Sequence, residues 1–195
     1  MDIILASNNK HKHDEFARLF PGHRILLPKD VGVDFSFEEN GKTFLENALG
    51  KAMTLFALVK KPVVSDDSGL CVDALGGEPG IFSSRYGATD GKLLETPQRN
   101  DYLLSRIRGV ADRKAYFVCC MVLVLEESRF FTAQETVHGE ICESPRGEHG
   151  FGYDPLFVIP GTGKTIAELP DAKKDLLSHR GRAARRIAAV LENGA

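Results

Sequence analysis

Three acidic residues have the types and spacing of a metal-dependent hydrolytic site. Asp66 and Asp67 end the apolar run in PVVSDDSGL, and Glu38 stands beside Glu39 in SFEENG. Successive strand residues point to opposite faces, so we expect one aspartate to face a cleft while its neighbour braces the loop that follows. If Glu38 and one aspartate converge, they suit Mg²⁺, which prefers few carboxylates plus substrate phosphates. A carboxylate beside such a metal could also orient or deprotonate water. The simpler alternative for both stretches is a solvated or capping turn.

A basic loop, ASNNKHK, follows the first apolar run. In open α/β sheets, ligands bind at the carboxyl ends of strands near helix N-termini, where backbone N–H groups attract anions. Lys10 and Lys12 would add positive charge to such a phosphate site. The alternative is an ordinary strand-to-helix turn with Asn9 as the N-cap.

Two later stretches suggest recognition of a flat ligand. Glycines flank Phe151 and Tyr153 in GEHGFGYDP, which would let the loop approach a ligand closely and stack an aromatic ring on it. The alternative is a Gly-rich turn with Phe151 in the core. In KKDLLSHRG, His179 and Arg180 could present donors to a carbonyl or phosphate, although such a pair is also common as surface charge.

Composition limits the classes of protein that these residues could serve. The 195 residues suit one domain or two closely joined lobes, and 43% hydrophobic residues supply a core. The net charge of -2 argues against a general binder of nucleic acid or membrane surfaces. No apolar run approaches the ~20 residues of a spanning helix, and the four cysteines form no CxxC pair. We therefore expect a reduced, cytoplasmic protein.

The apolar periodicity indicates an α/β fold that would position these residues. Strand, helix and strand are expected over residues 2–7, 12–20 and 23–28, and a long helix runs from Thr43 to Lys60. A third strand follows at 61–67, and a helix lies within 93–109. Residues 115–127 predict a central strand paired as a hairpin with 129–141. A further strand at 154–160 precedes a last helix from about Ser178 to Asn193, stopped by Gly194.

Six stretches, taken in order, resemble the inosine triphosphate pyrophosphatase family. They are ASNNKHK, FEENGKTFLENA, SDDSGL with VDALGG, SSRYG, HGFGYDPLF and ELPDAKKDLLSHRG. The resemblance implies a single domain over residues 1–195 with an elongated mixed sheet, flanking helices and two lobes around a central active-site cleft. It also implies a homodimer and Mg²⁺-dependent hydrolysis of ITP, dITP or XTP to the monophosphate and pyrophosphate, which removes noncanonical purines from the nucleotide pool.

The same resemblance assigns roles to individual residues. It implies that Glu38 and Asp67 hold the metal and that Asp67 is the proton acceptor. Substrate contacts are implied for Ser7, Asn8, Asn9, Lys10, His11, Lys12, Lys51, Ser68, Phe151, Gly152, Tyr153, Asp154, Lys174, His179 and Arg180.

Selectivity for such bases has a physical explanation. Hypoxanthine and xanthine carry an acceptor oxygen at the six position, where adenine carries an amino donor. A donor such as Arg180 would pair with that oxygen and oppose adenine, and a hydrogen-bonding site can reject a mismatched analogue by ~10⁴ or more. Guanine also has the oxygen, so this contact does not exclude it.

Two other functions remain open from the sequence. One is a pyrophosphatase for a different odd nucleotide, such as a modified pyrimidine triphosphate. The other is a nucleotide-binding module without turnover, which the full set of carboxylates and lysines disfavours. A purely structural or interaction protein would not need charged residues placed after strands.

Overall fold

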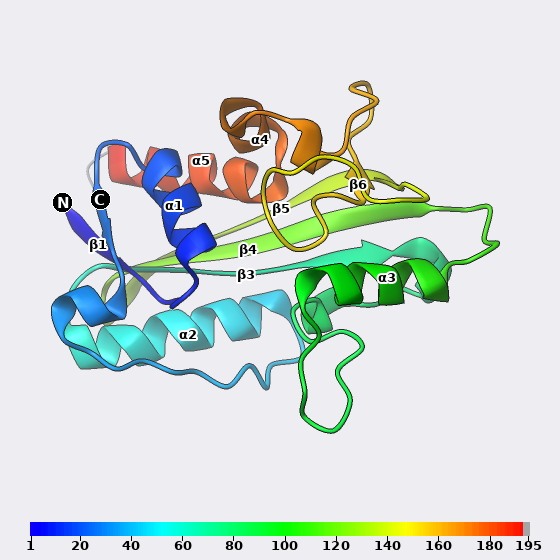
Figure 1. The fold of residues 1–195 in the computed structure, drawn as a ribbon. Helices are drawn as coiled ribbons and strands as arrows, with labels where there is room; N and C mark the ends of the chain where they lie inside the picture. Colours follow the sequence, from blue (N-terminus) through cyan, green and yellow to red (C-terminus); the bar gives the residue numbers. More distant parts are fainter. Residues whose placement is uncertain (193–195) are drawn as a thin grey trace. The chain divides into compact units, whose positions relative to one another are not determined.

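The computed structural model describes residues 1–192, which form five α-helices and six strands (Figure 1). In chain order these are β1 (Asp2–Leu5), α1 (Lys10–Leu19), β2 (Arg24–Leu26), α2 (Phe44–Val59), β3 (Val63–Val72), α3 (Thr96–Arg106), β4 (Lys114–Glu126), β5 (Arg129–Ile141), β6 (Phe157–Val158), α4 (Asp171–Leu177) and α5 (His179–Glu192).

The strands form one mixed sheet in the order β2-β1-β3-β4-β5-β6. β1 pairs in parallel with both β2 and β3, as expected for strands joined through helices, whereas β5 and β6 are antiparallel. β4 lies inside the sheet, and its long apolar run is buried on both faces. The prediction of a mixed α/β fold with flanking helices is therefore confirmed.

The chain divides into two compact units. The first comprises Met1–Asp67, Cys119–Glu135 and the chain from Arg180 onward, and the second comprises Ser68–Val118 and Thr136–His179. β3, β4 and β5 each contribute residues to both units.

The first unit is a sheet covered on both faces. Alternate strand residues enter two different cores because strand side chains alternate between faces. Ile3 and Val64 pack with α1 and α5, whereas Ile4 and Val63 pack with α2. Figure 1 shows α1 and α5 on one side of these strands and α2 on the other. The two faces of β3 in this unit therefore meet different helices.

The second unit has one core. Leu103 of α3 and Ile107, the residue that follows this helix, pack there with residues of β3, β4 and β5 and with the segment that follows β5. Tyr153 is part of this core and is only 4% exposed. Its burial raises the pKa of the Tyr153 hydroxyl.

The main differences from the sequence-based expectation concern two strands and one helix, whereas the first three elements shift by up to two residues at their ends. β3 does not stop at Asp67 but continues to Val72, because SDDSGL is buried on both sides of the strand. The strand expected over 154–160 is reduced to Phe157–Val158. The helix α4 was not predicted, and it is separated from α5 by the extended residue Ser178. The predicted stop at Gly194 lies outside the described residues.

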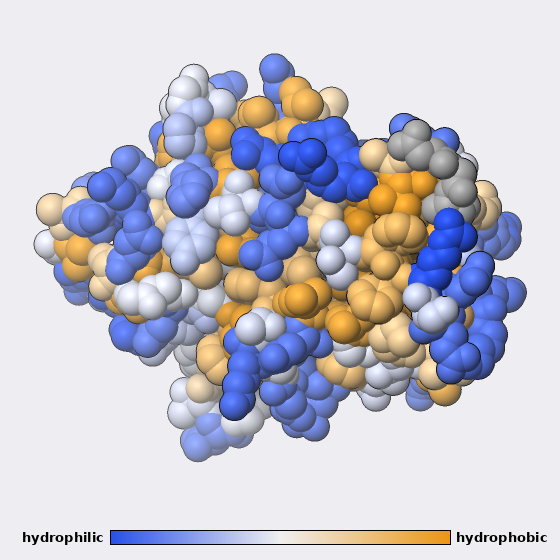
Figure 2. Space-filling view, turned by 180° about the vertical axis from the view of Figure 1, so that it is seen from behind, coloured by the Kyte–Doolittle hydropathy of each residue, from blue (hydrophilic) through white to orange (hydrophobic). Residues whose placement is uncertain are grey.

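The surface mixes hydrophobic and charged residues. On the face shown in Figure 2, hydrophobic side chains lie among hydrophilic ones. Large hydrophobic side chains that are exposed are Met1, Leu45, Leu58, Phe82, Leu93, Phe130 and Leu176. No helix within residues 1–192 combines the length and the apolar character needed to cross a membrane.

Candidate functional site

Asp66 lies at the centre of a buried charge network on one face of β3. Its Oδ1 accepts a hydrogen bond from Lys12 Nζ at 2.7 Å, and its Oδ2 accepts two from Arg180 at 3.1 and 2.9 Å. Arg180 Nη1 also donates to Glu15 Oε2 at 2.9 Å. Burial alone would raise the pKa of Asp66, but the charges of Lys12 and Arg180 outweigh it and hold the pKa well below its ordinary value. Asp66 therefore ties α1 and α5 to the sheet.

Asp67 points to the opposite face of β3 and meets α2. Its Oδ2 accepts from Asn47 Nδ2 at 3.0 Å, and its Oδ1 lies 3.6 Å from Lys51 Nζ. Burial raises the pKa of Asp67 above its ordinary value, Glu39 adds to the rise, and Lys51 and Asn47 oppose it. A carboxylate whose pKa is raised is a better proton acceptor near neutral pH than an ordinary one.

Asn47 fixes the orientation of Asp67 from inside α2. It is fully buried, and its Oδ1 accepts from the backbone N–H of Gly41 at 2.8 Å. With Oδ1 engaged by a donor, the amide must present Nδ2 to Asp67. A Cβ at Gly41 would meet Asn47 Oδ1 at 2.5 Å, so only glycine allows this approach. Sequence reasoning missed Asn47, because buried Asn within a helix gives no signal of a role.

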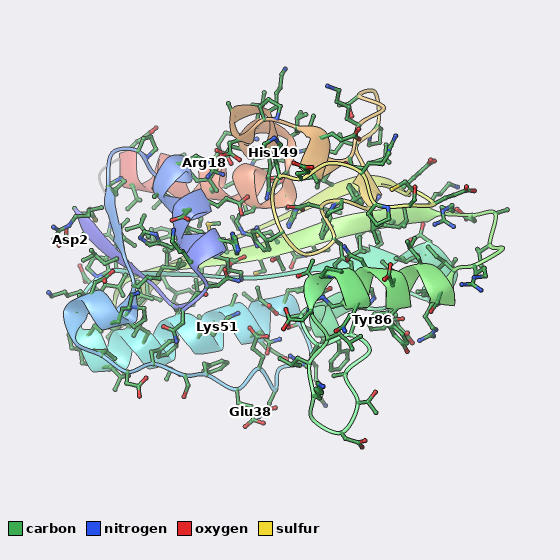
Figure 3. All side chains as sticks on the ribbon, in the orientation of Figure 1. Asp2, Arg18, Glu38, Lys51, Tyr86 and His149 are labelled. Carbon is green, nitrogen blue, oxygen red and sulfur yellow. The ribbon has the colours of Figure 1, made fainter. Side chains whose placement is uncertain are left out.

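The two glutamates of the loop before α2 differ in their surroundings. Glu39 forms an ion pair with Lys51, which is only 7% exposed. Burial would lower the pKa of Lys51, but Asp67, Asp66 and Glu39 outweigh it and raise the pKa, so the lysine keeps its charge. Glu38 is exposed and projects from the loop in Figure 3. Lys51 lies beside both Asp67 and Glu39, and the predicted convergence of Glu38 with Asp67 stays a prediction.

The basic loop before α1 is capped by its own side chains. Asn9 Oδ1 accepts from the backbone N–H groups of His11 and Lys12, and Ser7 Oγ accepts from that of Asn9. Asn8 donates to the backbone oxygen of Phe35 at 2.8 Å. Asn9 is thus the N-cap, as the alternative expected, and the phosphate site stays a prediction that would rest on the side chains of this stretch. Of these, Lys10 is exposed and pairs with Asp14.

In the second unit, Phe151 and Tyr153 point to different environments. Tyr153 is buried and donates to the backbone oxygen of Ser83 at 3.0 Å. Phe151 is half-buried, and its ring lies 4.9 Å from Lys174 Nζ. The alternative that placed Phe151 in the core is wrong, because Tyr153 occupies the core. Phe151 is the ring that could stack on a ligand.

Asp154 and Lys174 form a buried ion pair beneath this loop. Asp154 Oδ2 accepts from Lys174 Nζ at 2.8 Å and from the backbone N–H of Phe151 at 2.9 Å. Asp154 and Lys174 are 4% and 3% exposed. Their pairing holds the loop in shape.

Four further residues were predicted to contact the substrate: Ser68, Gly152, His179 and Arg180. His179 is 4% exposed and stacks on Phe117, with ring centroids 4.5 Å apart. Ser68 is half-buried on β3, and Gly152 is half-buried with φ +63°. Arg180, expected at the base, has two carboxylates as partners, and a contact with the six-position oxygen stays a prediction.

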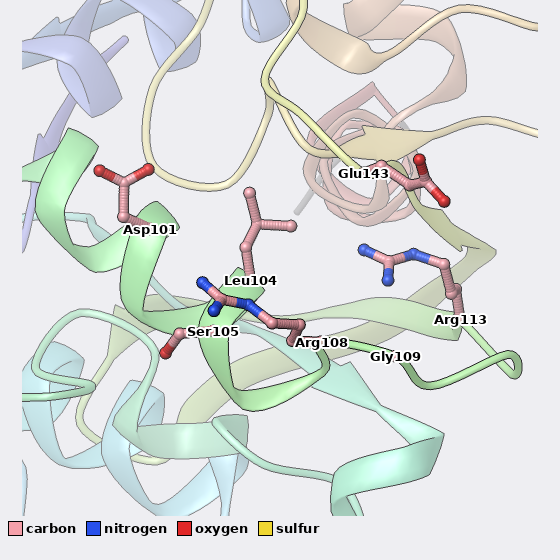
Figure 4. Close-up of a pocket in the computed structure, with 7 residues that line it drawn as sticks. All are labelled: Asp101, Leu104, Ser105, Arg108, Gly109, Arg113 and Glu143. Atoms are coloured by element: carbon pink, nitrogen blue, oxygen red, sulfur yellow. The ribbon is translucent and has the colours of Figure 1, made fainter.

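A separate hollow lies beside α3 (Figure 4). Its volume is about 520 Å³, and its lining includes Asp101, Leu104, Ser105, Arg108, Arg113 and Glu143. Arg113 donates to the backbone oxygens of Ile141 and Cys142. None of the predicted site residues lines this hollow.

The oxygen atoms around Asp67 suit a hard cation that is coordinated partly by protein carboxylates and partly by phosphates. Within residues 1–192, no group of three or more His, Cys, Asp or Glu side chains is arranged to hold a metal ion alone. Mg²⁺ is usually bound by one or two carboxylates plus waters and substrate phosphates, so few protein ligands are expected. Asp67 and one glutamate of the preceding loop match that chemistry.

The sequence and the fold of the chain match those of known proteins. A sequence profile of the Ham1 family matches residues 3–190. The chain is 52% identical over 183 residues to a dITP/XTP pyrophosphatase of Treponema denticola, covering 94% of each chain. It is 44% identical to one of Burkholderia pseudomallei, covering 97% of this chain and 92% of that one. The solved Ham1 protein of Staphylococcus aureus superposes with a TM-score of 0.87 at 37% identity, covering 100% of both chains.

Proposed function

Because the chain belongs to the Ham1 family, we propose that it is a nucleoside triphosphate pyrophosphatase that hydrolyses ITP, dITP and XTP to the monophosphate and pyrophosphate. The observation that carries this proposal is the surroundings of Asp67. A buried carboxylate with a raised pKa lies beside a buried, charged lysine. The names of the relatives support dITP and XTP as substrates, and ITP shares the six-oxo base.

The proposed reaction is attack of water on the α-phosphorus. Asp67 accepts the proton of that water, and Asn47 holds the carboxylate in place. Lys51, with Lys10 and Lys12, supplies positive charge for the triphosphate and for the departing pyrophosphate. Reactions of this kind depend mainly on positioning and on electrostatic stabilisation.

Mg²⁺ is part of the proposal. Asp67 and Glu38 would hold it, as the resemblance implies, and Glu39 lies near enough to Lys51 to affect the same group of charges. When bound, the ion would neutralise phosphate charge and polarise the phosphoryl oxygens.

The base is expected to contact the loop of Phe151 and Gly152. Phe151 would stack on the purine, and the backbone of the loop would meet its edge. Asp154 and Lys174 stabilise the loop, because Asp154 pairs with Lys174 and also accepts the backbone N–H of Phe151. A homodimer and a cytoplasmic location remain predictions, and a solution mass measurement tests the first.

The test is product analysis with purified protein and Mg²⁺. ITP, dITP, XTP, ATP and GTP are supplied separately, and pyrophosphate and orthophosphate are measured. We expect monophosphate and pyrophosphate from the first three and little turnover of ATP or GTP. Orthophosphate as the direct product would move the attack to the γ-phosphorus and overturn the mechanism. A modified pyrimidine triphosphate as the best substrate would overturn the choice of base.

A further inference from the structure

Asn100, on α3, contacts the loop that is proposed to receive the base. Its side chain is 3% exposed, and its Nδ2 donates to the backbone oxygen of Gly152 at 3.1 Å. The loop and α3 both belong to the second unit. Asn100 matched no motif in the sequence and has no place in the mechanism above.

The loop needs such contacts because its glycines give it many conformations in the unfolded chain. Gly150 and Gly152 have φ values of +76° and +63°, in the left-handed region that glycine enters freely. Asp154 holds the N–H of Phe151, and Tyr153 is anchored through its hydroxyl. The carbonyl of Gly152, between these two anchors, is held by Asn100. Fixing this carbonyl fixes the Gly152–Tyr153 peptide plane, and with it the backbone of Gly152, the residue that follows Phe151.

Packing does not account for an amide at position 100. Asn100 Oδ1 is buried and has no hydrogen-bond partner within the described residues. A buried carbonyl oxygen without a partner is unfavourable, whereas an apolar side chain of similar size would avoid that cost. Leu103, on the same helix, is fully buried in the core of this unit. The bond from Nδ2 to Gly152 is therefore the feature that distinguishes Asn100 from a leucine.

We propose that Asn100 is a positioning residue for base recognition, which holds the Gly152 carbonyl so that Phe151 keeps the orientation needed to stack on a purine. This inference rests on the proposed function. Asn100 acts through the loop and does not touch the phosphates. Its effect should therefore appear for ligands that carry a base and be absent for pyrophosphate.

The test compares the wild-type protein with Asn100→Leu in steady-state hydrolysis of ITP. We expect KM for ITP and the inhibition constant of IMP to rise about tenfold, the scale of one lost hydrogen bond. We expect kcat and the inhibition constant of pyrophosphate to change by less than about twofold, because the reacting phosphates are untouched. The melting temperature should change little, since removal of a buried oxygen without a partner offsets the loss of the hydrogen bond to the Gly152 carbonyl.

Two control variants separate positioning from stability. Asp101→Asn changes the adjacent residue, which lines the hollow of Figure 4, and should leave all four constants unchanged. Leu103→Ala opens the core and should lower the melting temperature without raising the inhibition constant of IMP selectively. If Asn100→Leu does not fold, Asn100→Ala is measured in its place.

Each outcome decides the inference. Asn100 would be only a structural residue if the inhibition constants of IMP and pyrophosphate rose equally in Asn100→Leu. The same conclusion would follow if the melting temperature fell while the kinetic and inhibition constants stayed unchanged. Absence of ITP, dITP and XTP hydrolysis by the wild-type protein would instead reject the proposed function, and the inference would fall with it. Normal wild-type turnover with unaltered IMP inhibition in the variant would reject the inference alone.

Discussion

The two faces of β3 place adjacent aspartates in opposite electrostatic settings. Asp66 meets two cations on the side of α1 and α5, and its pKa lies well below the ordinary value despite its burial. Asp67 meets Asn47 and a lysine shared with Glu39 on the side of α2, and its burial raises its pKa. Ionised Asp66 is thus stabilised by the fold, whereas ionised Asp67 is not. Asp66 therefore supports the structure, whereas Asp67 is suited to proton transfer.

Asp67→Asn should have the largest effect on activity. We expect kcat to fall by about 10²–10⁴-fold, the usual contribution of a positioned proton acceptor. Burial disfavours ionised Asp67, but its charge also compensates buried Lys51, so the two effects of the neutral amide oppose each other and the melting temperature should change little. Hydrolysis assays and a thermal melt measure the two results. Unchanged turnover would remove Asp67 from the mechanism, and a large loss of stability would contradict the comparison.

Asp66→Asn should have the opposite profile and mainly lower stability. Removing one partner from a buried ion pair typically costs about 3–5 kcal/mol. Here Arg180 and Lys12 would both lose the charge of Asp66, although Arg180 would keep Glu15. Urea unfolding gives the free energy directly. Arg186→Gln, which breaks an exposed pair with Glu135, is the matched control and should cost about 0–1 kcal/mol. Equal costs for the two variants would show that burial of the Asp66 network contributes nothing.

Substitution of each glutamate in the loop before α2 should distinguish a role in metal binding from a role in stabilising Lys51. Glu39→Gln leaves the charge of buried Lys51 less compensated, so we expect a loss of about 1–3 kcal/mol in unfolding free energy. Exposed Glu38→Gln should leave the melting temperature unchanged but raise the Mg²⁺ concentration needed for half-maximal activity. Binding of Mn²⁺, followed by electron paramagnetic resonance, checks the second effect without turnover. An unaltered Mn²⁺ affinity would exclude Glu38 as a ligand.

The pH dependence of stability should differ in sign between the two aspartates. An unfolded aspartate takes up its proton near pH 3.9, whereas folded Asp66 has a lower pKa, so its stabilisation is present above that pH and is lost as the pH falls. The difference in unfolding free energy between the wild type and Asp66→Asn should therefore shrink below about pH 4. For Asp67, whose folded pKa is raised, the wild type should lose stability relative to Asp67→Asn as the pH rises above about 4. If the unfolding free energies of the wild type and both variants changed with pH in parallel, the opposite pKa shifts of Asp66 and Asp67 would be refuted.

From the sequence, most of the helices and strands could be predicted, whereas the roles of the site residues stay predictions. Apolar periodicity predicted α1, α2, α3 and the paired β4 and β5, because burial of one face or both imposes a regular spacing of side chains. Alternation along a strand also separated Asp66 from Asp67 before any contact was known. Six motifs in order indicated the family.

The partner of each charged group depends on tertiary packing and could not be read from the sequence. Continuation of β3 through SDDSGL could not be predicted, because adjacent carboxylates disfavour a strand unless cations from distant helices compensate them. Arg180 reaches Asp66 across 114 positions of the chain, and Asn100 reaches Gly152 across 52. Such contacts cannot be predicted from local sequence, because they form between elements that are neighbours in space but far apart in the chain.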